Sequence, residues 1–240
     1  MAERLAKFMA RCGVCSRRDA EEMIKQKRIT VNGEIVETPA FNVSGEEKIL
    51  LDGENLPVIP KTRLWLYHKP VGLLTTHKDS ANRATVFENL PQDMPRVISV
   101  GRLDLNSEGL LLLTNNGELS RQLELPQNAW SRRYKVRVHG YVDSKKLAKL
   151  AQGVEIDGVQ YGSVQAQLES QNGTNSWILV TLSEGKNREV RKLMKFIGLE
   201  VARLIRLSYG PFQLGSLKKG EVREVPQKVL REQLGSKFKL

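Results

Sequence analysis

The chain has 240 residues, of which 40% are hydrophobic, and it carries a formal net charge of +11. Two cysteines are too few for a disulfide-stapled secreted domain, and no apolar run approaches the ~18 residues of a membrane-spanning helix. The first residues also lack the apolar core of a signal peptide, so we expect a cytoplasmic protein.

The excess positive charge is unevenly distributed along the chain. Residues 1–60 hold nine Lys and Arg against ten Asp and Glu, a balance of −1, whereas residues 61–240 hold 29 against 17, a balance of +12. Because Lys and Arg replace counterions along a phosphate backbone, this balance favours a polyanionic partner for the larger segment.

The beginning of the chain predicts a small module of two helices and a hairpin. Apolar residues at helical spacing predict a first helix over 5–12. Ser16 and Asp19 form a capping-box pattern for a second helix that ends near Lys27. Alternating β-branched residues around an Asn-Gly pair predict a hairpin with a type I′ turn over 29–36.

This module is similar to the alpha-L RNA-binding domain, first seen in a ribosomal small-subunit protein. The similarity rests on Arg4-Leu5, Gly13, Ser16-Arg17-Arg18, Ala20, Ile24 and Ile29-Val31-Asn32-Gly33. It implies that a basic helix face contacts folded RNA, and we assign Arg4, Arg17 and Arg18 as contacts. The alternative is a solvated helix surface, because acidic residues interleave with the basic ones.

Cys12 and Cys15 form a C-x-x-C pattern, which is typical of zinc or redox sites. The three histidines of the chain are not in ligand spacing with another potential ligand. We therefore expect reduced cysteines near a helix end and no metal site.

Two prolines predict a linker over 56–62, which separates a module of residues 1–55 from a domain of residues 63–232. Residues 233–240 are interpreted as a basic tail. In the larger domain, segments typical of strands outnumber those typical of helices. The strands are expected at 64–67, 96–100, 134–138 and 178–182, and the helices at 119–124, 144–153 and 187–197. The pattern predicts an α+β fold with a mainly antiparallel, mixed sheet.

One segment combines a carboxylate and a guanidinium directly before an apolar run. It reads Gly101-Arg102-Leu103-Asp104-Leu105-Asn106-Ser107-Glu108-Gly109, and Leu110-Leu111-Leu112-Leu113-Thr114-Asn115-Asn116-Gly117 follow. In an extended chain Arg102 and Asp104 point the same way, so Arg102 is expected to keep Asp104 ionised. Glu108-Gly109 predicts a turn before a core strand. Asp104 would suit an acid nucleophile, or it could simply build a turn.

The same segment resembles the signature of the bacterial ribosomal RNA pseudouridine synthases of the RsuA/RluB type. Three further motifs occur in that family's order, and the set spans nearly all of residues 63–226. They are Lys69-Pro70-Val71-Gly72, Arg133-Tyr134-Lys135-Val136 and Glu184-Gly185-Lys186-Asn187-Arg188-Glu189-Val190-Arg191-Lys192. The resemblance implies that Asp104 is the nucleophile, and that Tyr134 stacks on the base and serves as a proton shuttle. It also implies that Arg191 is the cation that keeps Asp104 charged.

Each of these assignments has a structural alternative. Tyr134 could be a core tyrosine of a strand, and Arg191 an exposed helix residue. Arg102 is expected to fill the gap left by an extracted uridine or to bind a phosphate. The Lys-Pro-Val-Gly turn is interpreted as architectural. Phosphate contacts near a helix start, with an exposed charged face as the alternative, are expected from Lys186, Arg188 and Lys192.

Taken together, the resemblance implies an enzyme that isomerises a specific uridine of ribosomal RNA to pseudouridine. The start of the chain favours large-subunit over small-subunit RNA as the target. The reaction needs no cofactor, and attack at the ribose C1′ or at C6 of the base both remain open. We expect a monomer with no membrane partner. An alternative from another class is a noncatalytic RNA-binding ribosome-assembly protein that retains the fold.

Overall fold

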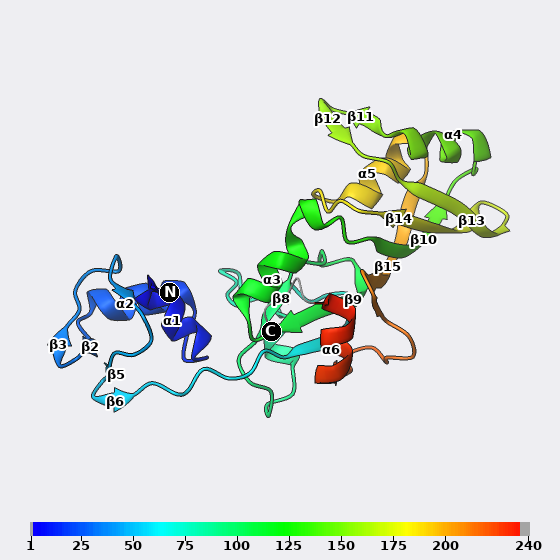
Figure 1. The fold of residues 1–240 in the computed structure, drawn as a ribbon. Coiled ribbons are helices and arrows are strands. Elements are labelled where there is room, and N and C mark those ends of the chain that lie inside the picture. Colours follow the sequence, from blue (N-terminus) through cyan, green and yellow to red (C-terminus); the bar gives the residue numbers. More distant parts are fainter. Residues whose placement is uncertain (1, 236–240) are drawn as a thin grey trace.

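A computed structural model of the chain describes residues 2–235, which form a small amino-terminal module and a larger sheet domain (Figure 1). The module has its own apolar core, in which Leu5, Met9, Ile24 and Ile29 are fully buried. Its elements are β1 (Glu3–Arg4), α1 (Leu5–Arg11), α2 (Arg17–Lys25), β2 (Ile29–Val31), β3 (Glu34–Ile35), β4 (Asn42–Val43), β5 (Ile49–Leu51) and β6 (Glu54–Asn55).

The local signals in the module act as the sequence indicates. Ser16 Oγ accepts a hydrogen bond from the backbone nitrogen of Asp19, and the Asp19 side chain accepts one from the Ser16 backbone. This capping box fixes the start of α2. Asn32 and Gly33 have φ of 52° and 90°, which is the left-handed pair that a type I′ turn requires between β2 and β3. Both predicted helices and the hairpin are confirmed.

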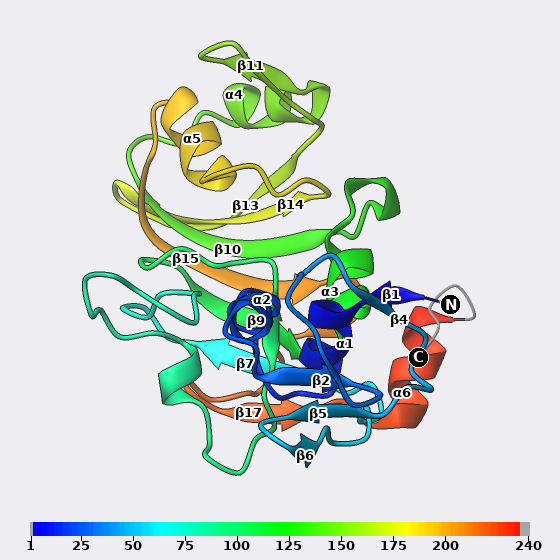
Figure 2. The same cartoon turned by 90° about the vertical axis from the view of Figure 1, so that its left-hand side faces the viewer.

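The larger domain is built on one long twisted sheet, with nine strands among the described residues. Figure 2 shows the strands stacked in the order β13-β14-β10-β15-β9-β7-β17. In the described chain the pairs of this sheet are antiparallel except β9 with β15, so the predicted α+β architecture is confirmed. The strands are β7 (Leu64–Lys69), β8 (Ile98–Val100), β9 (Glu108–Thr114), β10 (Arg132–His139), β13 (Gln165–Asn172), β14 (Asn175–Leu182), β15 (Glu200–Tyr209), β16 (Phe212–Gln213) and β17 (Val222–Glu224).

Strand β9 explains the unbroken leucine run. Leu110 and Leu112 pack into one apolar cluster, whereas Leu111 and Leu113 pack into another on the opposite face of the sheet. A strand that is buried on both faces needs no polar alternation. The expected turn at Glu108-Gly109 is wrong, because both residues already belong to β9.

Helices cover the faces of the sheet. In Figures 1 and 2, α4 and α5 lie over the half that contains β10, β13 and β14, while α3 and α6 lie beside the β7–β9 half. The three predicted helices are present, although the one expected over 144–153 ends as a short 3-10 turn. The remaining elements are α3 (Gly117–Glu124), α4 (Ser144–Lys149), α5 (Glu189–Phe196), α6 (Gln227–Leu234), β11 (Val154–Ile156), β12 (Val159–Tyr161) and 3-10 turns at Phe87–Asn89, Pro126–Asn128 and Leu150–Gln152.

The ends of the predicted segments differ slightly from the structure. The segment between Asn55 and Leu64 is irregular, as expected of the linker. The tail was expected to begin at residue 233, but helix α6 continues to Leu234. Residues 236–240 of the expected tail lie outside the described residues. Across residues 2–235, no helix combines the length and apolar character needed to cross a membrane.

Two ion pairs connect the module to the larger domain. Lys7 Nζ on α1 lies 2.5 Å from Glu118 Oε1 at the start of α3. Asp19 Oδ1 on α2 lies 2.9 Å from Lys78 Nζ. Figure 1 shows α1 on the side of the module that faces α3. The module is therefore positioned by charge pairs as well as by the linker.

Candidate active site

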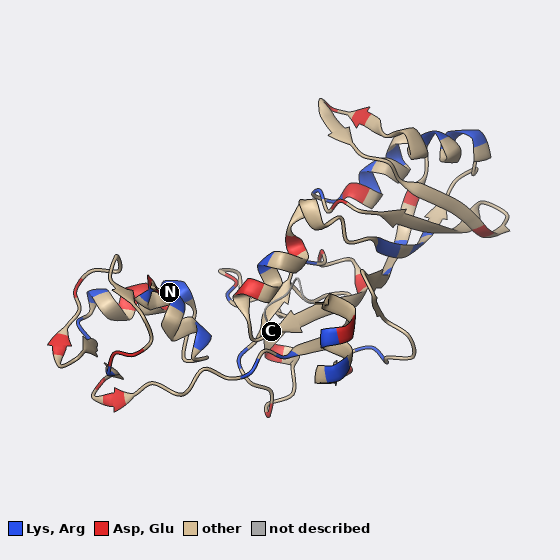
Figure 3. Ribbon diagram, in the orientation of Figure 1, with Lys and Arg blue, Asp and Glu red and all other residues tan. Residues whose placement is uncertain are grey.

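The main candidate site is a cavity of about 810 Å³ where the two halves of the sheet meet. This size suits a nucleotide-sized ligand. Its walls come from the loop between β8 and β9, the end of α3, the starts of β10 and α5, and strand β15. Figure 3 shows basic residues on β10, on α5 and on the loop before α5. The lining therefore brings together residues from distant parts of the chain, and several of them are Lys or Arg.

Asp104 lies in the loop between β8 and β9 and lines this cavity. Its side chain is 38% exposed, and its Oδ2 lies 3.8 Å from Nη1 of Arg188. The strand expected over Arg102 to Asp104 is absent, because this stretch is loop, so strand geometry does not set the two side chains on the same side as predicted. Arg102 is exposed and lines the cavity, but the cation that the structure pairs with Asp104 is Arg188.

The Asp104 loop is held from behind by a fully buried lysine. Lys69 Nζ donates hydrogen bonds to the carbonyl oxygens of Pro70 at 2.9 Å, Asp104 at 3.2 Å and Ser107 at 2.9 Å. Burial lowers the pKa of Lys69 to about 8, while the charges of Asp104 and Glu108 act in the opposite direction. Three carbonyl acceptors make Lys69 a clamp on the backbone that carries Asp104.

The turn after Lys69 adds to this support. The backbone nitrogen of Gly72 donates to the carbonyl oxygen of Leu105 at 2.9 Å, and Gly72 has a φ of 88° that favours glycine. Thr75 Oγ1 donates to the carbonyl oxygen of Leu103 at 2.9 Å. Lys69 and Gly72 therefore bind the loop at and after Asp104, and Thr75 binds it before Asp104, which matches the interpretation of the Lys-Pro-Val-Gly turn as architecture.

Arg191 contacts the same loop through backbone rather than through the carboxylate. Its Nη2 donates to the carbonyl oxygen of Asn106 at 2.8 Å, and its Nη1 donates to that of Val201 at 3.1 Å. Burial lowers the pKa of Arg191, as does the neighbouring Arg188, while Asp104 raises it. Arg191 is half-buried on α5 and ties the loop to β15, so the exposed-helix alternative does not describe it.

Tyr134 forms part of the cavity floor. It is 9% exposed on β10, and its register partners are Val180 on β14 and Arg206 on β15. Tyr134 also belongs to the apolar cluster under α5, so it is a core residue with one edge in the cavity. The core interpretation is therefore correct, and the stacking and proton-transfer roles of Tyr134 stay predictions.

Arg132, two residues before Tyr134 on β10, is buried and also lines the cavity. Arg132 Nη1 donates to the carbonyl oxygens of Ser183 at 2.9 Å and Glu184 at 3.0 Å, and its Nη2 donates to Tyr209 Oη at 2.8 Å. It thereby fixes the loop that leads to Arg188. The signal for it was an arginine on the same strand face as Tyr134 and Val136.

The other expected phosphate contacts divide into two groups. Lys186 and Arg188 are exposed and line the cavity, whereas Lys192 is exposed outside it. Lys186 also pairs with Glu184 and donates to the carbonyl oxygen of Gln160 at 2.8 Å. Glu189 is buried beside them, and burial raises its pKa.

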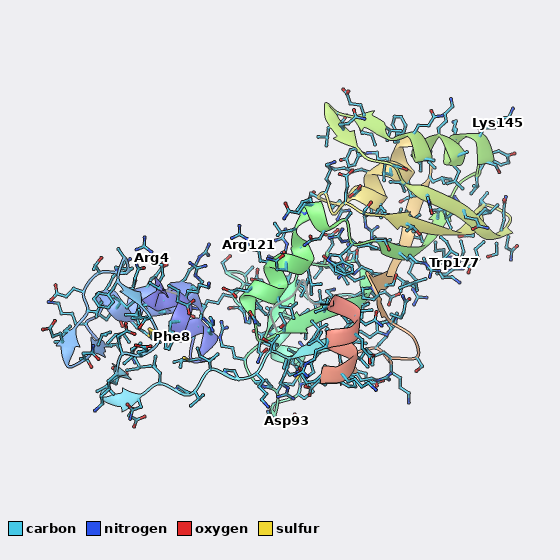
Figure 4. The ribbon with its side chains drawn as sticks, viewed as in Figure 1. Arg4, Phe8, Asp93, Arg121, Lys145 and Trp177 are labelled. Carbon is cyan, nitrogen blue, oxygen red and sulfur yellow. The ribbon has the colours of Figure 1, made fainter. Side chains whose placement is uncertain are left out.

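The module contributes three exposed arginines away from the cavity. Arg4 precedes α1, and Arg17 and Arg18 form the first turn of α2. Figure 4 shows Arg4 on the upper side of the module. Two other basic residues of α1 are engaged by acids, since Lys7 and Arg11 both pair with Glu3. Arg4, Arg17 and Arg18 therefore remain the candidates for RNA contact in the module.

Two segments of the chain match known protein families. Residues 63–196 match the family described as RNA pseudouridylate synthase, and residues 3–49 match the S4 domain. The chain belongs to the RNA pseudouridylate synthase family. It is therefore an isomerase that acts on uridine in RNA, and the predicted resemblances of both parts of the chain are confirmed.

Relatives of the synthase extend over nearly the whole chain. An uncharacterized RNA pseudouridine synthase of Rickettsia bellii is 51% identical over 229 residues, covering 95% of this chain and 99% of the relative. The ribosomal large subunit pseudouridine synthase B of Yersinia pestis is 40% identical over 220 residues, covering 89% and 69%. A crystal structure of a pseudouridylate synthase superposes with a TM-score of 0.67 at 29% identity, covering 97% and 99%. These matches do not favour a noncatalytic assembly protein.

Proposed function

We propose that this synthase converts one uridine, or a close cluster of uridines, of large-subunit ribosomal RNA to pseudouridine, with Asp104 as the nucleophile. The observation that carries the proposal is the Asp104 carboxylate itself, which is partly exposed in the cavity beside Arg188 while its backbone is held by Lys69. The large-subunit target is supported by the similarity to synthase B of Yersinia pestis. We also propose that the synthase acts as a monomer in the cytoplasm, where ribosomes assemble.

The chemistry requires the target base to leave the RNA stack. A carboxylate inside a cavity reaches a nucleotide only if that nucleotide is flipped out of its helix or loop. Arg102, Lys186 and Arg188 lie around the cavity and supply positive charge for the flanking phosphates. Lys192 and the module arginines Arg4, Arg17 and Arg18 extend this contact along the RNA.

The reaction exchanges one bond for another with no net redox change. Asp104 attacks C1′ of the ribose or C6 of the base, and the bond between C1′ and N1 breaks. The uracil turns and a bond forms between C1′ and C5, while the bond from Asp104 to C1′ or C6 breaks and restores the carboxylate. The C5 proton is lost to a base, and N1 takes up a proton. Tyr134 lies at the cavity floor, where its ring stacks on uracil and its hydroxyl serves the proton transfer. Arg188 pairs with the carboxylate, and Arg191 holds the backbone of the loop that carries it.

The test combines a mapping experiment with one substitution. Carbodiimide mapping of ribosomal RNA from cells with and without the gene is expected to show the loss of one signal, or of a close cluster, in large-subunit RNA. On a stem-loop around that uridine, Asp104→Asn is expected to abolish turnover while binding stays within a few fold. Unchanged ribosomal RNA in the deletion strain would reject the target, and full turnover by Asp104→Asn would reject the nucleophile.

A further inference from the structure

Arg206 is a buried arginine on the cavity floor that the proposed mechanism leaves without a role. It is 3% exposed, lies on β15 and is the register partner of Tyr134 on β10. It lines the cavity together with Leu204, which lies two residues earlier on the same face of the strand. A charged residue at a buried, inward position of a strand is costly unless an acceptor satisfies it.

The protein satisfies this guanidinium only in part. Nε donates to the carbonyl oxygen of Leu110 at 2.7 Å, and the Tyr209 ring lies 5.3 Å from the guanidinium carbon. Nη2 is buried and has no hydrogen-bond partner among residues 2–235, and no carboxylate in that range forms an ion pair with Arg206. A buried cation with an unused donor indicates that a further acceptor completes the site.

Depth in the cavity decides which acceptor fits. Three exposed cations, Arg102, Lys186 and Arg188, line the cavity, and an RNA backbone that stays outside would meet those first. A flipped base enters furthest, and Tyr134 next to Arg206 is placed to stack on it. Uracil presents two neutral carbonyl oxygens, which accept hydrogen bonds without bringing a charge into the interior.

We propose that the terminal nitrogens of Arg206 donate a hydrogen bond to a carbonyl oxygen of the extruded uracil and thereby determine which base the cavity accepts. The inference rests on the proposed function and adds a specificity residue to it. If the acceptor is O4, cytosine is rejected, because its amino group would meet the guanidinium donors with no acceptor between them. The same bond holds the base during the interval in which it is detached from the sugar.

The experiment pairs changes in the protein with changes in the substrate. Wild type, Arg206→Met and Arg206→Lys are assayed on the mapped stem-loop with uracil, 2-thiouracil or 4-thiouracil at the target, because sulfur accepts hydrogen bonds poorly. A fourth substrate carries a methylphosphonate next to the target uridine, which removes one phosphate charge. Arg206→Lys retains a buried cation and serves if Arg206→Met does not fold.

The expected result is a coupling between the residue and one thio substitution. The kcat/KM of wild type should be about 10- to 100-fold lower on one thio substrate than on the uracil substrate. Arg206→Met should already have a kcat/KM on the uracil substrate that is lower than that of wild type by a similar factor, and the thio substitution should lower it little further. The methylphosphonate should lower the kcat/KM of wild type and of Arg206→Met by the same factor. Independent losses on both thio substrates, or coupling to the methylphosphonate alone, would overturn the proposal. Turnover of the unmodified stem-loop by wild type reports on the proposed function separately.

Discussion

The ammonium group of Lys69 and the backbone carbonyl oxygen of Asp104 lie 3.2 Å apart, although 35 residues separate them in the chain. Lys69 ends β7 in the interior of the sheet, and Asp104 presents its carboxylate to the cavity on the other side of the loop. The carboxylate of the proposed nucleophile is thus exposed, while the backbone that carries it is fixed by the last residue of a strand. Such support preorganises a reacting group at little cost in flexibility elsewhere.

The first prediction concerns Lys69 and pH. Burial lowers its pKa in the folded protein to about 8, from an ordinary value of 10.5. Between these values the unfolded chain binds more protons than the folded one, so this group makes the free energy of unfolding rise with pH over that window. The rise amounts to up to about 3 kcal/mol.

Lys69→Met should lack this rise, which urea denaturation at pH 7.5 and pH 10 would measure. Lys145→Met, at an exposed position on α4, is the matched control and should follow wild type. An equal pH response of Lys69→Met and wild type would contradict the burial argument.

The second prediction separates Arg191 from Arg188. Arg191→Met removes two hydrogen bonds that join the Asp104 loop to β15, and should lower the free energy of unfolding by about 1–3 kcal/mol and kcat/KM by about 100-fold. Arg188→Met removes an exposed charge 3.8 Å from Asp104, and should lower kcat/KM by about 10-fold with stability unchanged within about 0.5 kcal/mol. Urea denaturation and stem-loop kinetics measure both. The reverse order of stability effects would contradict these assignments.

The third prediction tests the module as an RNA-binding surface. Arg17→Gln and Arg18→Gln should each weaken RNA binding and reduce the slope of log affinity against log salt by about 1, with kcat at saturation unchanged. Lys145→Gln is the control, since Figure 4 shows Lys145 on α4, far from the module. Filter binding between low and moderate salt would measure the slope, and equal slopes for Arg17→Gln and the control would exclude a phosphate contact at that position.

The fourth prediction concerns Gly109, where β9 meets β15. Its φ is 107°, and an added Cβ would lie 2.5 Å from the backbone nitrogen of Arg206 and against its carbonyl oxygen. Gly109→Ala should therefore lower the free energy of unfolding by about 3 kcal/mol or more, because both obstacles are backbone. Gly158→Ala has a similar positive φ in open space and should cost only about 1 kcal/mol. Thermal unfolding of both variants would decide, and equal losses would show that the close approach has no effect.

Local signals in the sequence were sufficient for much of the fold. The capping box at Ser16, the Asn32-Gly33 turn and the leucine run of β9 depend on neighbours in the chain, so their sequence patterns carry the information. Glu108 shows the limit. It was expected in a turn, but it is a buried strand residue, because Arg203 and Lys219 pair with its carboxylate from positions 95 and 111 residues further along the chain.

The same limit applies to the site. A motif could nominate Asp104, Tyr134 and Arg191, but the ion-pair partner of Asp104 comes from a loop 84 residues further along the chain. Lys69 and Arg132 act on backbone carbonyls, which leave no trace in residue identity. Arg132 and Arg206 each gave a local signal, as an arginine beside apolar strand residues, but that signal does not reveal what either side chain binds.

The ion pairs Lys7–Glu118 and Asp19–Lys78 set the span between the arginines of the module and the cavity. An RNA that binds both the module and the cavity must have a folded shape that covers this distance. We therefore expect the enzyme to select a uridine by its distance from the RNA segment that the module binds. Inserting one base pair between that segment and the target uridine should leave RNA binding unchanged and abolish pseudouridine formation.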